Sequence, residues 1–144
     1  MPQADFENLK GYAGYLLDNK LHDLVLFSII RAKEENLFII KGQSDKKLRI
    51  FLEKSHTKFL TDIIEANPID AQLALLYAWV NADQSGFPSR TIKHTEIIKA
   101  YNIRKKVTLA FVEEYTPNLF YQKAIRNEMN ILLHIIEKMT LQLL

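Results

Sequence analysis

The sequence predicts an all-α fold, a single domain of five or six helices that spans residues 1–144 and ends in a long C-terminal helix. Three observations predict it. Only four glycines and four prolines interrupt the 144 residues, which leaves long segments and argues against a β fold with many turns. Apolar residues recur at the helical spacing of three and four along most of those segments. The composition, 48% apolar and 25% charged, is that of a globular domain with a core.

Composition and charge exclude several classes of protein. The formal net charge is +2, with both signs spread along the chain. We therefore expect neither nucleic acid nor a membrane surface as the main partner, because such binding needs a concentrated field. No cysteine is present, which excludes disulfides, thiolate catalysis and cysteine-based zinc sites. The N-terminus is unlike a signal peptide, and the apolar run at residues 24–30 is too short to cross a membrane. These features predict a cytoplasmic protein.

Two segments open the helical part of the sequence. The first, residues 5–19, places apolar side chains on one face: Phe6, Leu9, Ala13, Leu16 and Leu17. The second, residues 21–40, begins at a similar spacing, but LVLFSII and LFII within it are also rich in branched and aromatic residues and could form a hairpin. The Glu-Glu joint between them lacks Gly, Asn-Gly or Pro turn chemistry, so we prefer helix.

A predicted helix break, KGQSD at residues 41–45, separates the second and third segments. Gly42 can end one helix in a left-handed conformation, and Ser44 or Asp45 can cap the next by accepting free backbone N–H bonds. Residues 45–66 then carry the strongest amphipathic pattern of the first half, which predicts a helix.

The following helix is expected at the centre of the fold. Asn67-Pro68 opens residues 70–84, which are apolar almost all round, and a helix that is apolar on every side is covered by its neighbours. Gly86-Phe87-Pro88 then forms a tight joint, because Gly86 can stop the helix and Pro88 prevents its continuation. The helical period resumes over residues 90–114.

The last helix is expected to begin after Thr116-Pro117 and to run to the final residue. Six of its apolar residues fall at spacings of 4, 3, 4, 3 and 4, a coiled-coil seam: Ile125, Met129, Leu132, Ile136, Met139 and Leu143. Other apolar residues lie off this seam, so one face can pack into its own bundle while the other meets a partner subunit. Burial of both faces in one core is the alternative. The chain stops on an apolar pair without a capping signal, which predicts the N-terminal part of a longer protein.

Five features follow one another in the second half of the sequence. They are an Ala-rich helix, a Gly-Phe-Pro joint, a long helix, a short break and a long final helix, at residues 78–84, 86–88, 91–114, 115–117 and 118–144. In this order they resemble the N-terminal sensory domain of RsbR/RsbRD-type proteins, the bacterial stressosome co-antagonists. The final helix departs from the family in one respect, since NILLHII stands where members often carry an acidic or histidine-rich stretch.

The resemblance implies a globin-like helical bundle that need not hold haem. It also implies a homodimer that passes a conformational change through its last helix to an effector domain of the STAS, kinase or phosphatase type. The expected function is a non-enzymatic regulatory sensor domain without a cofactor. A helical protein–protein interaction adaptor without a small ligand is the alternative.

Histidines are the candidates for metal or haem chemistry, and none has the partners that such chemistry needs. Glu53 and His56 have the Glu-x-x-His spacing that di-iron bundles use twice, but no second copy occurs, so a solvated polar face is preferred. His94 has polar neighbours, which argues against a haem ligand and for a surface position. His134 lies among apolar residues and is expected to be buried and neutral. No catalytic, metal or cofactor site is predicted.

Aromatic and basic residues complete the candidate sites. The basic runs at residues 45–49 and 103–107 are flanked by acidic residues and are expected to be solvated helix faces. Aromatic residues at helical spacing are commonly core residues, but bundle interiors are also where ligands bind. The residues that could line a pocket for a small apolar ligand are Phe59, Tyr77, Trp79, Tyr101 and Phe111.

Overall fold

The computed structural model describes residues 6–37, 41–65, 67–82 and 93–143, with side chains described throughout these ranges except at residues 78–82. Seven helices occupy them: α1 (Glu7–Asn19), α2 (Leu21–Glu34), α3 (Asp45–Ile64), α4 (Pro68–Ala82), α5 (His94–Leu109), α6 (Val112–Tyr115) and α7 (Leu119–Leu143). No strand occurs within these ranges. The predicted all-α fold class with a long C-terminal helix is therefore confirmed.

The choice between helix and hairpin for residues 21–40 is decided for most of that segment. Residues 21–34 form α2, so the preference for helix is confirmed there. Residues 38–40 lie outside the described residues, and so does the Gly-Phe-Pro joint at residues 86–88. The expectations for these two short stretches stay predictions.

The C-terminus of α2 carries a capping motif that the sequence analysis did not predict. Asn36 has a left-handed φ of 52°. Its N–H donates to the Lys33 carbonyl, and the Leu37 N–H donates to the Ala32 carbonyl, both at 3.2 Å. This pair of bonds closes the last turn, with Leu37 buried beside it. The helix thus ends well before Gly42, because Asn also tolerates the left-handed region, and Gly42, at φ 79°, belongs to the turn before α3.

Side-chain caps fix the starts of α3 and α7. The Ser44 hydroxyl accepts a hydrogen bond from the Lys47 N–H at 3.1 Å, so Ser44 is the cap of α3 and Asp45 is its first residue. Asn118 does the same for α7, since its Oδ1 accepts from the backbone N–H groups of Phe120 at 2.9 Å and Tyr121 at 3.2 Å. Each cap satisfies donors that the helix itself leaves free.

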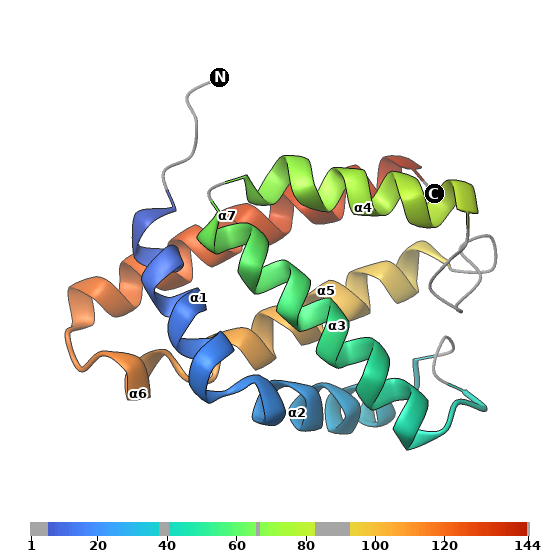
Figure 1. Cartoon of the computed structure of the whole chain (residues 1–144), viewed down its shortest axis with the longest axis horizontal. Helices are drawn as coiled ribbons and strands as arrows, with labels where there is room; N and C mark the ends of the chain where they lie inside the picture. The colour runs from blue at the N-terminus through green and yellow to red at the C-terminus, as the bar shows by residue number, and fades with distance from the viewer. Residues whose placement is uncertain (1–5, 38–40, 66, 83–92, 144) are drawn as a thin grey trace.

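α7 is the element that most of the others contact. It packs against α1, α4, α5 and α6, while α3 packs against α1, α2 and α4. Figure 1 shows α4 and α7 running alongside each other and α3 crossing diagonally toward α2. Because these helices cross and do not lie in one parallel bundle, the arrangement is consistent with the globin-like bundle that was expected.

The position of α4 corrects one prediction. Residues 70–84 were expected to form a central helix, but Leu75 and Tyr77 are 45% and 49% exposed. Among residues 68–77 only Pro68 and Gln72 are buried. The apolar composition of α4 therefore does not make it central, because α7 and α3 pack against it and leave Leu75 and Tyr77 exposed.

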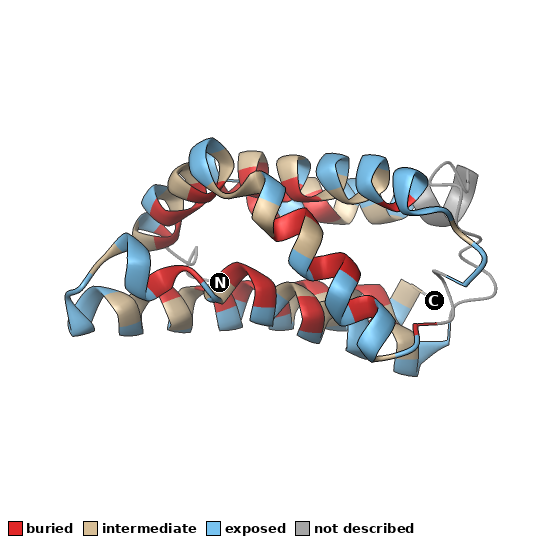
Figure 2. Cartoon of the chain, turned by 90° about the horizontal axis from the view of Figure 1, so that it is seen from below, coloured by how far each residue is buried: buried red, intermediate tan, exposed pale blue. Residues whose placement is uncertain are grey.

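The core lies between α1, α3, α5 and α7. Figure 2 shows buried positions on the sides of the helices that face one another and exposed positions on the outer sides. Burial of each large apolar side chain stabilises the fold by about 1.5–3 kcal/mol. Among the fully buried residues are Leu9, Tyr12, Leu16, Phe59, Ile63, Met129 and Leu132.

The predicted coiled-coil seam of α7 belongs to this core. Ile125, Met129, Leu132 and Ile136 are each 0–1% exposed within a single chain, and Met139 and Leu143 are half-buried. These six residues were expected on the dimerising and signalling helix, and the structure makes their stripe the face of α7 that packs into its own bundle, against α1, α4 and α5. A dimer contact through the other side of α7 stays a prediction. A spacing of three and four selects one face of a helix, whichever chain packs against that face.

Candidate functional site

Arg104 on α5 extends to α3, and the contacts that it makes there define the candidate site. The guanidinium carbon lies 4.6 Å from the centroid of the Phe59 ring, and Nη2 donates a hydrogen bond to the Ser55 hydroxyl. Ser55 and Phe59 are four residues apart on α3, so they lie on one face of that helix. Phe59 is fully buried, whereas Arg104 is half-buried. A cation thus lies at the edge of the apolar core.

The charge of Arg104 is not balanced by a neighbouring carboxylate. In the described part of the chain, no Asp or Glu lies within ion-pair distance of its guanidinium. Burial lowers the pKa of Arg104 from its ordinary value, although an arginine stays charged in proteins. Removing an unpaired charge from water costs several kcal/mol. The contacts with Phe59 and Ser55 offset part of that cost, and the exposed part of the side chain stays in water.

His56 lies next to this cluster and is almost completely buried, at 1% exposure. Its Nε2 and the Ser28 hydroxyl are 2.9 Å apart and share a hydrogen bond that joins α3 to α2, while its Nδ1 has no hydrogen-bond partner among the described residues. Burial, with a smaller effect from the Arg104 charge, lowers the pKa of His56 to about 3. The ring is therefore neutral at neutral pH. The expectation that Glu53 and His56 share a solvated face is wrong for His56, because it lies on the same stripe as Phe59 and Ile63.

Tyr101 connects this region to α7. It precedes Arg104 by three residues on α5, and its hydroxyl donates a hydrogen bond to the Thr140 hydroxyl of α7 at 2.8 Å, because the one proton of Thr140 is used elsewhere. Thr140 is buried and donates to the Ile136 carbonyl at 2.8 Å. Burial raises the pKa of Tyr101, which keeps its hydroxyl protonated. The chain of contacts therefore runs from α3 through α5 to the last turns of α7.

A shallow depression of about 380 Å³ lies between α5 and α7 beside Tyr101. Its lining is mixed in character and includes amide, cationic, anionic and apolar side chains: Tyr101, Asn102, Lys105, Asn130, Leu133, His134 and Glu137. His134 is exposed here, so the prediction of a buried histidine is wrong, because apolar neighbours in sequence do not fix which side of the helix His134 occupies. His94 is exposed as expected.

The predicted aromatic pocket residues do not meet in one place. Phe59 and Tyr101 both border Arg104, whereas Phe111 packs near the other end of α5, where its ring lies 5.7 Å from that of Phe27. Tyr77 is largely exposed, and the side chain of Trp79 lies outside the described residues. Phe59, Tyr77, Tyr101 and Phe111 therefore do not line a single pocket, because they lie on different helices and faces, and the expectation for Trp79 stays a prediction.

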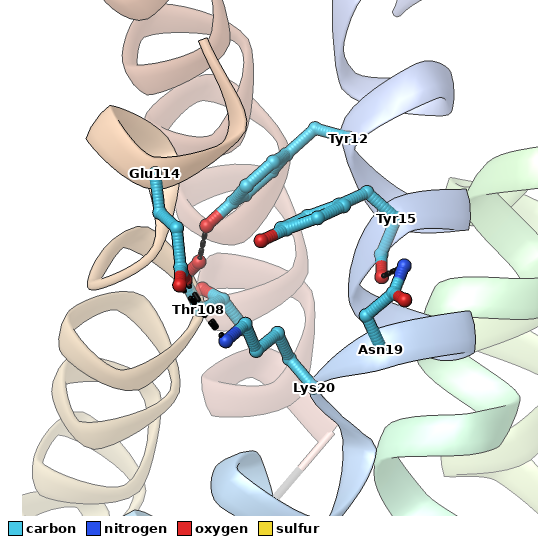
Figure 3. Close-up of polar contacts among 6 residues, drawn as sticks. All are labelled: Tyr12, Tyr15, Asn19, Lys20, Thr108 and Glu114. Atoms are coloured by element: carbon cyan, nitrogen blue, oxygen red, sulfur yellow. Dashed lines mark hydrogen bonds and ion pairs between the residues drawn. The ribbon is translucent and has the colours of Figure 1, made fainter.

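A second polar cluster fastens α1 to the end of α5. Figure 3 shows Tyr12 and Tyr15 directed from α1 toward the segment that contains Thr108 and Glu114. The Tyr12 hydroxyl donates to the Thr108 carbonyl, and Lys20 forms an ion pair with Glu114 at 3.0 Å. Burial raises the pKa of Tyr12. These contacts join α1 to the segment around the end of α5, and they border no described cavity. We therefore assign them a structural role.

The sequence analysis missed Arg104, Ser55, Ser28 and Thr140 as members of the site. The run at residues 103–107 was expected to be a solvated face. A signal was nevertheless present, since residues 97, 101, 104 and 108 follow the helical spacing of three and four and place Arg104 on a stripe with buried Ile97 and Thr108. Because the basic run at residues 103–107 was interpreted as a whole, the different position of Arg104 within it was not recognised.

Comparison with known proteins adds no relative. No family model matches the chain, and neither a curated protein nor a solved structure is significantly similar to it. The resemblance to RsbR-type sensory domains stays a prediction. No described helix is long and apolar enough to cross a membrane. No group of three or more metal-ligating side chains occurs in the described part of the chain.

Proposed function

We propose that this chain is a non-enzymatic regulatory input domain, cytoplasmic and homodimeric, that relays a signal through α7 to an effector domain. The observation that carries the proposal is the Tyr101–Thr140 hydrogen bond, which joins the α5 site to the buried side of α7. A change at Arg104 can reach α7 through Tyr101, which lies one turn away on the same helix. Such a relay requires two packings of α7 that are close in free energy, one of which the ligand prefers.

The length and contacts of α7 support the same proposal. The helix has 25 residues and packs against four other helices, so a shift along its axis changes contacts throughout the domain. Its two halves also differ. Side chains near its start are largely exposed, whereas Ile125 to Ile136 carry the buried stripe. A helix that is anchored in the middle can transmit motion to the segment that follows it.

The test is a search for two packings of α7 by methyl relaxation dispersion, which detects exchange on the microsecond to millisecond timescale. We expect exchange at the methyl groups of Ile136 and Met139 and little at Leu9 and Leu16 of α1, which serve as internal controls. Tyr101→Phe, which breaks the link to Thr140, should change the exchange in α7. Uniformly rigid methyl groups in α7, unchanged by Tyr101→Phe, would overturn the relay.

An interaction adaptor is the second candidate, and a surface at the start of α7 favours it. Leu119, Phe120 and Tyr121 are 78%, 76% and 50% exposed. Adjacent exposed apolar side chains of this size commonly mark contact surfaces. If the chain is an adaptor, the double variant Leu119→Ser with Phe120→Ser should abolish partner binding while α7 shows no exchange. The relaxation experiment on α7 therefore separates the two functions.

A further inference from the structure

Arg104 has a charge that the described residues leave unmatched, although it lies at the edge of the core. Natural folds place such cations opposite an acid or use them to bind an anion. We propose that Arg104 binds a small oxyanion, a carboxylate or phosphate group, between α3 and α5. This inference rests on the proposed input function in that it names the chemical class of the ligand.

The contacts that the structure gives for Arg104 use only part of its guanidinium. The Phe59 ring covers one face of the planar guanidinium, and Nη2 is engaged with the Ser55 hydroxyl. Stacking on a face leaves the edges of the guanidinium free, and those edges carry the N–H donors that grip two oxygens of a carboxylate or phosphate at once. Because the side chain is only half-buried, an anion from solvent has a route to it.

Two neighbours of Arg104 supply further polar groups. The Ser55 hydroxyl, which accepts from Arg104, has its own proton to donate. The buried Nδ1 of His56, on the next residue of α3, has no partner. When the Ser28 hydroxyl donates to Nε2, the proton of the neutral ring is on Nδ1, which then lacks an acceptor. Unsatisfied buried groups are rare in native proteins, and the two cationic or N–H-bearing side chains of this cluster, Arg104 and His56, have no acidic partner among the described residues.

The depression between α5 and α7 is a weaker candidate for the same ligand. Its lining contains Lys105 and Glu137, so a cation and an anion already lie in it together. The small apolar ligand that the sequence suggested also fits less well. Of the four predicted pocket residues whose side chains are described, Phe59 and Tyr101 border the site, and the group beside them is a cation.

The experiment titrates the whole chain at pH 7 with sodium acetate and, separately, with sodium phosphate, at an ionic strength held constant with sodium chloride. Backbone amide shifts of residues 55–59 on α3 report on binding. We expect saturable shifts in the wild-type protein. Arg104→Lys keeps the charge but loses the forked geometry, so binding should weaken at least about tenfold. Arg104→Gln should abolish saturation.

Lys105→Gln is the matched control, because it removes a neighbouring exposed cation from the same helix. Its titration should equal that of the wild-type protein. Thermal unfolding of each variant without added anion verifies that the α3 resonances come from folded protein. If Arg104→Gln does not fold, Arg104→Lys decides the outcome alone. Linear shifts that sodium chloride reproduces, or equal affinities in wild type and Arg104→Lys, would overturn the site.

The relay through α7 and the oxyanion site at Arg104 can each be refuted while the other stands. If acetate or phosphate saturates at Arg104 and the exchange of α7 does not respond, the oxyanion site stands and the relay is refuted. If α7 exchanges between two packings but neither anion saturates, the relay stands and the site is refuted. Saturation by phosphate alone or acetate alone supports the site and identifies which oxyanion it prefers.

Discussion

Burial of His56 couples the stability of this protein to pH. The ring lies between α2 and α3 with one nitrogen bonded to Ser28 and the other without a partner. Protonation would place a second positive charge close to Arg104, inside the core. The folded pKa of about 3 lies below the ordinary value of 6.5, so the unfolded chain binds a proton more readily than the folded one does.

The sign of the pH dependence follows from that difference. Above pH 6.5 the ring is neutral in both states, and its contribution to stability is fully present. As the pH falls from 6.5 toward 3, the unfolded state gains a proton that the folded state does not, and the free energy of unfolding decreases by up to about 1.4 kcal/mol per pH unit. We expect denaturant titrations between pH 6 and 4 to show a shallower dependence in His56→Gln than in wild type.

The exposed His94 provides the control for this measurement. His94→Gln removes a histidine from the surface, and its pH dependence is the reference against which that of His56→Gln is compared. Acidic side chains contribute to the slope equally in all three proteins. Identical slopes in wild type and His56→Gln would show that the folded state accommodates the charged ring.

At the scale of single helices, the two glycines of α1 form a matched pair. A methyl group at Gly14 would meet no atom within 4 Å, whereas one at Gly11 would lie 2.8 Å from the Tyr115 hydroxyl oxygen. Gly14→Ala should raise the free energy of unfolding by about 0.5–1 kcal/mol, since alanine favours helix. Gly11→Ala should gain less, because Tyr115 must move.

Chemical denaturation of both alanine variants tests this difference. Tyr115→Phe in the Gly11→Ala background removes the oxygen that the new methyl group meets and should recover part of the gain. Equal stabilisation by the two alanines would mean that the Tyr115 ring rotates away at no cost. The expected order depends on local contacts alone and on no proposal about function.

α7 offers a second matched pair, Leu132 and Ile131. Leu132 is fully buried and Ile131 is 42% exposed. Leu132→Ala should lower the free energy of unfolding by about 2–5 kcal/mol, and Ile131→Ala should change it by about 0.5 kcal/mol or less. Because the stripe packs within one chain, the loss at Leu132 should not depend on protein concentration. If the loss of stability caused by Leu132→Ala disappeared when the protein was diluted, the stripe would instead be part of a subunit interface.

The whole molecule is expected to dimerise. Light scattering should give a mass twice the 16.8 kDa of one chain. With its seam buried, α7 can contribute to that dimer mainly through exposed side chains, and Leu119 and Phe120 are the most exposed of its large apolar residues. The double variant Leu119→Ser with Phe120→Ser should therefore favour the monomer. A monomeric wild-type protein at high concentration would refute the homodimer.

Local patterns predicted the helices well but their surroundings poorly. The period of three and four located α1, α3 and α7, and the Ser44 cap and the Asn67-Pro68 boundary were readable from residue type. The end of α2 was missed because Asn36 adopts a backbone conformation for which glycine is the stronger signal. The pattern of α4 was read as central, although its exposed Leu75 and Tyr77 show that apolar composition does not reveal which neighbours are present.

The sequence by itself determined that this protein is helical, where most of its helices begin, and which side of α7 is apolar. Periodicity and capping are local properties, so they are written in short stretches of chain. Only the tertiary structure decided that the stripe of α7 packs within its own chain and that His56 is buried and His134 is not. It also decided that Arg104 lies against Phe59 with no carboxylate of the described residues beside it. These depend on which helices meet, and contacts between residues far apart in sequence leave no local signature.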